Sequence, residues 1–365
     1  MIDPTIRQKA EQAARTAAER AREVDLDDWL QRLYAAGKSP LLQQRLDLAK
    51  AHRWAGAVPT SEPVDLVRSS NAEPADVIGV DGSQVYPQDR NPVLWTYIQA
   101  VAYRKLFAPI FESQFVDIGS ELICSSPLAG ELLENRGGLA ALTNTWRTLL
   151  EMRLAQIASE RYPGGLVLLD NGLLPWLSVS GQSAQRHLRE YLDNLCAIRP
   201  GLIAGVISGP QSQLLSRLIA LVEAETIEQG VDEKYGVLDI VLMRHALNAG
   251  ERSALFLHGS PRNEVFLNAG AGVYFFFLRM NYQEIVRVEN PVWVAREPAL
   301  VDVVQASILA DACMTGYSYV LSQAHMHAVI TADIAHTVQS RALACYWQAL
   351  GRITPQSAKI IMKKA

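Results

Sequence analysis

The chain has 365 residues, of which 49% are hydrophobic and 20% charged, and its formal net charge is -4. This length suits one large domain or two moderate ones with a sizeable buried core. The slightly acidic balance excludes a basic field over the whole molecule of the kind that attracts nucleic acid, although a local basic channel would not show in the sum.

Cysteine usage and the termini bear on the compartment. Cys124, Cys196, Cys313 and Cys345 are far apart and form no CxxC pair, so we expect reduced thiols, not a zinc site or a disulfide framework. The N-terminus lacks the apolar core of a signal peptide, and no stretch approaches the ~20 apolar residues that span a bilayer. A soluble cytoplasmic protein without a membrane partner is expected.

The first 60 residues are predicted to form a helical extension that contacts the main body, an oligomer mate or a partner. Good helix formers dominate residues 3–24, and apolar residues recur at helical spacing over 26–35 and 41–54, with a break at 37–40. Residues 58–74 are rich in Pro, Ser and Glu and are the predicted linker. The main domain is expected to span residues 75–350.

Strands and helices alternate through the main domain, which predicts an α/β fold. Strands are expected at 77–80, within 93–107, at 166–169 and at 202–207, with a late hairpin formed by 273–280 and 285–289. Helices are expected at 139–160, 214–225, 299–312 and 327–350.

Two short apolar runs end in an aspartate. VIGVDGS places Asp81 after a predicted strand, and LVLLDNG places Asp170 after another. A carboxylate at the edge of an α/β sheet lies where ligands usually bind, and a pair of them suits Mg²⁺ or Mn²⁺, which prefer oxygen ligands. Taken singly, each aspartate is explained equally well as a turn residue that caps nearby backbone amides.

Glu151 is the third carboxylate of interest because it lies beside the apolar stripe of the helix that precedes the Asp170 strand. A carboxylate buried there needs a positive partner. Either a metal ion or a salt bridge to Arg147 or Arg153 meets that need.

Most of the seven histidines are expected to be incidental. His325 and His327 form an HxH pair, which on a strand would place both rings on one face as in some zinc sites. The surrounding Ala, Gln and Met favour a helix, where this spacing separates them, so at most one is expected in an active site. No Walker loop, GxGxxG, GxSxG or HExxH motif occurs, which disfavours the corresponding enzyme classes.

The order of the motifs resembles the NurA family of nucleases between about residues 77 and 330. VDGS, a helix glutamate, LLDNG, YFFFLRM, VRVENPVW and GYSYVLSQAH follow one another, and Arg287, Glu289 and Pro291 fit the family's R-x-E-x-P pattern. The resemblance implies an RNase H-like mixed sheet flanked by helices and an acidic site that binds Mn²⁺ or Mg²⁺. It also implies a ring-like homodimer that processes DNA ends with a HerA-type hexameric translocase.

Matched motif by motif, the resemblance assigns catalytic roles to Asp81, Glu151, Asp170, Tyr317 and His325. The three acids and the histidine are the implied metal ligands. His325 is alternatively the group that protonates the leaving oxygen, and Tyr317 either orients a phosphate or metal-bound water or is a packed aromatic.

The chain departs from the family pattern at three positions. Ser318 and Val320 replace two prolines of the C-terminal motif, so the loop before the histidine is expected to differ. Gly209 stands where many relatives have a lysine, so either phosphate charge is stabilised more weakly in this chain or another base such as Arg244 or Arg279 is the substitute.

The sequence therefore predicts a divalent-metal-dependent deoxyribonuclease that acts on single strands or duplex ends. The 5′ to 3′ polarity and a role in DNA repair rest on the resemblance alone. An actin-like ATPase or sugar kinase and a non-catalytic ring subunit of a DNA translocase are the alternatives.

Overall fold

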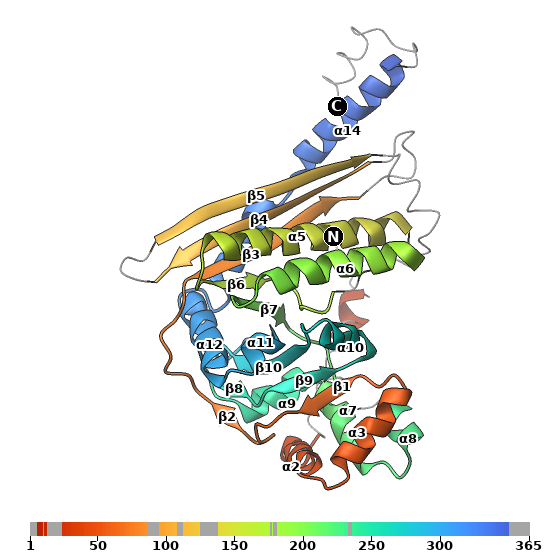
Figure 1. The fold of residues 1–365 in the computed structure, drawn as a ribbon, viewed down its shortest axis with the longest axis vertical. Helices are drawn as coiled ribbons and strands as arrows, with labels where there is room; N and C mark the ends of the chain where they lie inside the picture. The colour runs from red at the N-terminus through yellow and green to blue at the C-terminus, as the bar shows by residue number, and fades with distance from the viewer. Residues whose placement is uncertain are drawn as a thin grey trace.

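The computed structural model describes residues 6–9, 11–12, 24–86, 95–107, 112–124, 138–175, 177, 181–232 and 236–349. Within them, eleven strands form one mixed sheet (Figure 1). The strands are β1 (Gly56–Pro59), β2 (Val67–Arg68), β3 (Val77–Val85), β4 (Trp95–Leu106), β5 (Glu112–Cys124), β6 (Leu166–Leu169), β7 (Leu202–Ser208), β8 (Arg252–Ser253), β9 (Phe256–Gly259), β10 (Val273–Arg279) and β11 (Ile285–Pro291).

Helices flank this sheet. They are α2 (Leu26–Gly37), α3 (Leu42–Ala51), α5 (Gly138–Arg161), α6 (Gly181–Ala197), α7 (Leu214–Glu223), α8 (Ile227–Asp232), α9 (Asp239–Ala246), α10 (Pro261–Asn268), α11 (Val292–Ala295), α12 (Pro298–Ala312), α13 (Tyr319–Ala328) and α14 (Ala332–Ala349). Among the described helices, none combines the length and apolar character needed to cross a membrane.

One half of the sheet has the strand order β5-β4-β3-β6-β7, with β3, β4 and β5 antiparallel and β6 and β7 parallel to β3. This is the RNase H-like arrangement that the sequence predicts, and the fold class is confirmed. The other half continues through β11, β10, β9 and β1. The predicted hairpin is formed by β10 and β11, which pair antiparallel from Val273↔Pro291 to Arg279↔Ile285.

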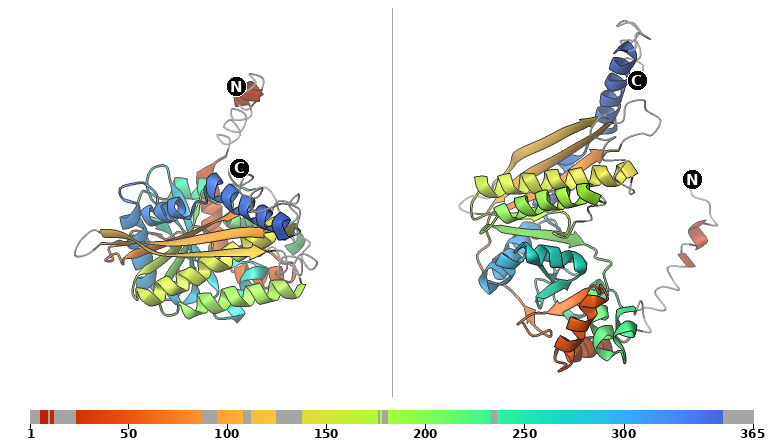
Figure 2. Two further views of the ribbon diagram at one scale, coloured as in Figure 1. Left: turned by 90° about the horizontal axis from the view of Figure 1, so that it is seen from above. Right: turned by 45° about the vertical axis from the view of Figure 1, so that its right-hand side comes forward.

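Each face of the β3–β6 region has its own helical cover because the strand residues alternate. Val80 and Leu169 face α5 and α6, whereas Val77 and Leu168 face the layer that contains α12 and α13. Figures 1 and 2 show α5 and α6 lying together across the sheet and α14 projecting beyond it. Two apolar cores thus hold β3 and β6 in place from both faces, and the candidate site lies at the end of these strands.

The N-terminal segment is packed on the main body. Leu33 of α2 and Ala57 of β1 belong to the same buried cluster as Leu218 of α7. β1 pairs with β9, and β2 pairs with β8, so parts of the predicted linker are sheet strands. The structure places residues 6–9 and 11–12 in helix, and the rest of the predicted first helix lies outside the described residues up to 23. The division into an extension and a nuclease domain stays a prediction.

Two predicted boundaries are wrong. β3 does not stop at Asp81 but continues to Val85, because the chain stays paired with β4 from Val77↔Lys105 to Val85↔Tyr97. The predicted helix over 327–350 is two helices, since α13 ends at Ala328 and α14 begins at Ala332. Strand β5 and helix α6 were not foreseen.

Candidate active site

Asp81 and Asp170 are neighbours on parallel strands. Val80 of β3 lies opposite Leu169 of β6, so Asp81 comes next on β3 and Asp170 comes directly after the end of β6. Side chains in the same register point to the same face, here the face covered by α13. The sequence prediction that these carboxylates share one sheet edge is therefore met by the geometry, although Asp81 lies inside its strand.

His325 reaches Asp81 because α13 crosses very close to β3. A Cβ on Gly79 would lie 2.5 Å from the Val320 carbonyl carbon, so only glycine permits this approach. His325 Nδ1 then lies 2.7 Å from Asp81 Oδ2. His327 instead stacks on Tyr103 with ring centroids 5.7 Å apart. The prediction that the HxH pair lies on a helix and contributes one residue to the site agrees with this geometry.

Tyr317 holds the second aspartate. Its hydroxyl donates to Asp170 Oδ1 at 2.7 Å, and it also hydrogen-bonds with the Ser208 side chain. Burial and the charge of Asp170 raise the pKa of Tyr317, so the phenol stays protonated as a donor. Burial, followed by the charge of Asp81, also raises the pKa of Asp170, against the hydrogen bond from Tyr317.

Glu151 approaches from the opposite layer, on α5, over Gly82. A Cβ at Gly82 would lie 2.5 Å from Glu151 Oε1. The glycine in VDGS is therefore needed to admit the Glu151 carboxylate and does not form a turn. Glu151 also interacts with the Gly82 backbone. Burial raises its pKa to about 7; the charge of Arg147 opposes the shift, and the charges of Asp81 and Asp170 add to it.

Arg147 is the cation at this cluster. Its Nε lies 3.2 Å from Glu151 Oε1, and its guanidinium donates to Gln84 Oε1 at 3.0 Å. Arg153, the other candidate partner of Glu151, binds two glutamates on the protein surface instead. The salt-bridge alternative is thus present, yet Glu151 Oε1 has no hydrogen-bond partner among the described residues.

The suggested substitutes for the family lysine are engaged elsewhere. Arg279 donates to the carbonyl oxygens of Arg244, Leu247 and Asn281, and Arg244 donates to a carbonyl of the β10–β11 turn. Gly209 follows β7 with a φ of +53°, a left-handed conformation that favours glycine.

Ser318, where relatives have proline, is the N-cap of α13. Its hydroxyl oxygen accepts from the Leu321 backbone N–H at 3.3 Å and donates to Asp311 Oδ2 at 2.6 Å. Asp311 is fully buried, and Lys105 lies 3.5 Å from its other oxygen. The loop that carries Tyr317 is thus fixed by a cap and a buried carboxylate, a different solution from a rigid proline.

The donor set fits a hard divalent cation. Asp81, Asp170 and Glu151 supply carboxylate oxygens, and Glu151 has a buried oxygen that lacks a hydrogen-bond partner. Among the described residues, no three or more His, Cys, Asp or Glu side chains form a group that could hold a metal ion in the present geometry. The fit therefore rests on ligand chemistry and on the unsatisfied oxygen.

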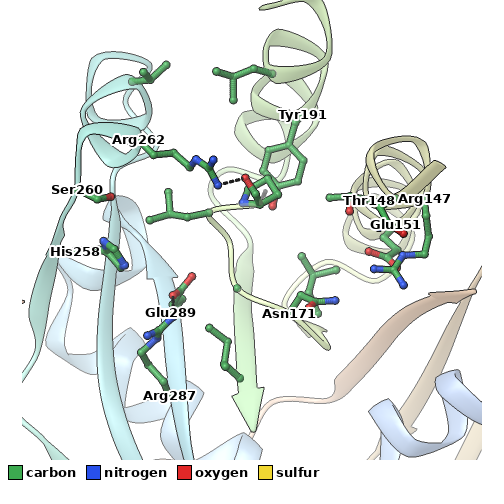
Figure 3. Close-up of a pocket in the computed structure, with 18 of the residues that line it drawn as sticks. Arg147, Thr148, Glu151, Asn171, Tyr191, His258, Ser260, Arg262, Arg287 and Glu289 are labelled. Atoms are coloured by element: carbon green, nitrogen blue, oxygen red, sulfur yellow. Dashed lines mark hydrogen bonds and ion pairs between the residues drawn. The ribbon is translucent and has the colours of Figure 1, made fainter. Parts of the chain in front are cut away.

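A cleft of about 1100 Å³ lies on the α5 face of the sheet, and Glu151 is the member of the acid cluster that lines it. Arg147, Thr148 and Glu151 lie on one side of it, and His258, Ser260 and Arg262 lie on the other (Figure 3). Its floor carries Arg287 and Glu289, the R-x-E pair of the sequence pattern, whose side chains approach to 2.9 Å.

Sequence reasoning missed the wall formed by His258, Ser260 and Arg262. A signal was present, because Ser-Pro directly after an apolar run and a glycine is a typical helix start. Ser260 is the N-cap of α10, with Pro261 in its first turn.

Comparisons with known proteins identify the family of the chain. A family model described as the NurA domain matches residues 75–330. A crystal structure of the NurA nuclease from Sulfolobus solfataricus is similar to this chain, with 12% identity, a TM-score of 0.56, and coverage of 95% of this chain and 98% of that one. This likeness shows a shared fold.

Two other solved structures are more distant. One, titled as NurA, has 11% identity and a TM-score of 0.44 and covers 90% of this chain and 97% of its own. The catalytic domain of human Endonuclease V has 16% identity and a TM-score of 0.34, with coverage of 86% and 97%. No curated protein sequence matches the chain.

Proposed function

The chain belongs to the NurA family, and from this premise we propose that it is a DNA nuclease that requires Mn²⁺ or Mg²⁺. The observation that carries the proposal is that Asp81 and Asp170 occupy matching positions beside the Val80–Leu169 pair, with Glu151 near enough for their charges to raise its pKa. Cleavage of a phosphodiester needs charge stabilisation at both the attacking and the leaving oxygen, and this is the chemistry that a carboxylate-bound divalent metal supplies.

The residues around the acids suit the proton transfers of hydrolysis. Asp81, Asp170 and Glu151 would hold the cation, with the second nitrogen of His325 as a further ligand. Alternatively, His325, oriented through Nδ1 by Asp81, presents its other ring nitrogen to protonate the leaving alkoxide. Tyr317 keeps one oxygen of Asp170 occupied, which leaves the other oxygen for the cation.

Arg147 has a separate part in the proposal. It lies beside Glu151, and its charge lowers the pKa of both Glu151 and Asp170. It is therefore placed to keep the acids ionised at neutral pH and to attract an anionic phosphate to them. In this chain it takes the role that a lysine at position 209 would have.

The proposal includes a homodimer. The apolar side chains of Phe115, Ile118 and Leu122 are 48%, 48% and 56% exposed on β5, on the face opposite α5. An exposed apolar row on an edge strand is typical of a surface that another chain covers. The HerA-type translocase, 5′ to 3′ polarity, action on single strands or duplex ends and a role in DNA repair rest on the family resemblance.

The family match favours this proposal over an actin-like ATPase or sugar kinase, and the retained acids favour it over a non-catalytic ring subunit. The test is cleavage of a labelled DNA oligonucleotide by the full chain with Mn²⁺. We expect degradation by the wild type and none by Asp81→Ala at equal concentration and with an unchanged unfolding transition. Persistent cleavage by Asp81→Ala would overturn the metal-site assignment.

A translocase partner needs its own test. Deleting residues 1–60 would remove α2, α3 and β1, which are packed on the main body. The appropriate variant therefore lacks only residues 1–23. We expect that variant to retain nuclease activity. Loss of binding to a HerA-type translocase at the same time would locate the contact in the N-terminal segment.

A further inference from the structure

The cleft beside the acids is positively charged, in contrast to the chain as a whole. Four arginines and two glutamates line it, which gives a formal charge of +2, whereas the chain carries -4. The cations are on both walls and on the floor: Arg147 on α5, Arg262 on α10, Arg287 on β11 and Arg53 before β1. A concave surface with this charge attracts polyanions.

Glu151 lines the cleft and interacts electrostatically with Asp81 and Asp170, so the cleft and the acid cluster meet at this residue. The opposite wall has no part in the proposed cleavage chemistry, yet it is built from polar groups. Ser260 accepts from the Asn263 N–H as the N-cap of α10, so the positive end of this helix faces the cleft (Figure 3). Arg262 is fixed there by a hydrogen bond to the Pro175 carbonyl at 2.6 Å.

Polar atoms in the cleft also lack hydrogen-bond partners. His258 Nδ1 on one wall and Arg287 Nε on the floor are buried, and neither has such a partner among the described residues. Buried polar groups are normally satisfied, so two such atoms in one cavity point to a polar occupant. Burial lowers the pKa of His258, so its ring is neutral and can both donate and accept.

We propose that this cleft receives the DNA strand on one side of the scissile phosphate, and that the wall formed by His258, Ser260 and Arg262 binds one of its backbone phosphates. The inference rests on the proposed nuclease function and adds a substrate path to it. A volume of about 1100 Å³ slightly exceeds the range of pockets that hold small molecules, ~300–1,000 Å³, and suits a few nucleotides of one strand rather than a duplex. Arg262 is a substrate-binding residue in this scheme and not a catalytic one.

The test measures binding of a fluorescent single-stranded 20-mer of deoxythymidine to the full chain in the Asp81→Asn background, at several salt concentrations. Loss of one phosphate contact in Arg262→Gln should weaken binding by roughly three- to tenfold and reduce the salt slope by about 0.7. In the Asp81 wild-type background, the same change should raise KM with kcat unchanged, because it removes binding that ground state and transition state share.

Two further variants separate charge from structure. Arg262→Lys keeps the charge and should keep the salt slope. Ser260→Asp keeps a good N-cap, so it should fold normally, but it places a negative charge at the phosphate position and should weaken binding at least as much as Arg262→Gln. Arg161→Gln is the matched control, because Arg161 ends α5, is exposed and also donates to a backbone carbonyl, yet does not line the cleft.

Wild-type affinity in both Arg262→Gln and Ser260→Asp would overturn the inference, as would equal losses in Arg262→Lys and Arg262→Gln. These outcomes leave the nuclease proposal intact if the wild type cleaves DNA. Cleavage by Asp81→Asn would instead contradict the acid site without affecting the binding comparison. A wild-type chain that neither binds nor cleaves the oligonucleotide would overturn both.

Discussion

Glu62 and Glu151 are two largely buried glutamates with opposite surroundings. Glu62 accepts two hydrogen bonds from Arg252, at 2.9 and 2.8 Å, and a third from the Leu255 backbone N–H at 2.7 Å. Burial would raise its pKa, but these bonds and the charge of Arg252 lower it overall. Glu151 has one nearby arginine, an oxygen without a hydrogen-bond partner, and a pKa of about 7.

The difference separates a carboxylate that stabilises the fold from one that we propose binds a cation. Glu62 is satisfied by the protein itself, as is Glu289, which accepts from the Leu173 N–H and lies beside Arg287. Glu151 gathers negative charge with Asp81 and Asp170 and has too little positive charge to balance it. Such a cluster is unfavourable for folding and favourable for binding a cation.

The largest effect is expected from Asp170→Asn. Removal of a ligand that stabilises charge in the transition state should reduce kcat/KM with Mn²⁺ by about a thousandfold or more. The unfolding transition should stay the same or rise, because mutual repulsion among the acids is relieved. Cleavage and thermal unfolding are measured on the same preparation; an active Asp170→Asn enzyme would refute the role of this residue.

Glu62→Gln should lower the stability of the protein without lowering its activity. It leaves the fully buried guanidinium of Arg252 with Asp302, 3.9 Å away, as the remaining charged partner among the described residues, and breaking a buried pair destabilises proteins by about 3–5 kcal/mol. Urea denaturation measures this loss. The nuclease activity per folded molecule should match that of the wild type. A loss of activity per folded molecule would contradict the proposed distinction between the two kinds of carboxylate.

Glu151→Gln should stabilise the metal-free protein at alkaline pH. Between about pH 4.5 and 7 the native state keeps a proton on Glu151 that the unfolded state has lost, so stability falls as pH rises through this window. The raised pKa corresponds to about 3 kcal/mol at pH 8, which the glutamine variant should recover. Urea unfolding of both proteins in EDTA at pH 5 and pH 8 tests this. The same difference in unfolding free energy between Glu151→Gln and wild type at both pH values would contradict it.

The smallest effect is expected at the cap of α13. Ser318→Ala removes the N-cap and one hydrogen bond to buried Asp311, and should lower stability by about 1–2 kcal/mol. Ser322→Ala is the matched control, because its hydroxyl donates only to the backbone carbonyl of Ser318, which Ser318→Ala retains. Similar losses in the two variants would show that Ser318 has no special part in holding the loop of Tyr317.

Local patterns in the sequence were enough to find the main elements of the site. Short apolar runs predicted β3 and β6, and the aspartates that follow them do meet at one edge. Sequence alone could not show that β3 continues past Asp81, because Asp-Gly signals a turn unless a partner strand pairs with it. Gly82 is needed because Glu151, which lies 69 positions further along the chain, packs against it.

The cleft was harder to foresee, because its walls come from α5, α10, β9 and β11, which are far apart in sequence. Long-range packing, not local propensity, brings Arg262 opposite Arg147. Likewise, the motif at Ser318 looked weakened by the loss of proline, whereas the buried Asp311 gives the serine a role that no local pattern indicates.

The central claim, that the acid cluster is a divalent-metal site, is tested most directly by calorimetric titration of the full chain with Mn²⁺ at pH 6 and pH 8. We expect binding that is lost in Asp170→Asn, and release of close to one proton at pH 6 but little at pH 8, because the cation displaces the proton of Glu151. Equal Mn²⁺ binding by wild type and Asp170→Asn, without proton release at pH 6, would contradict the claim.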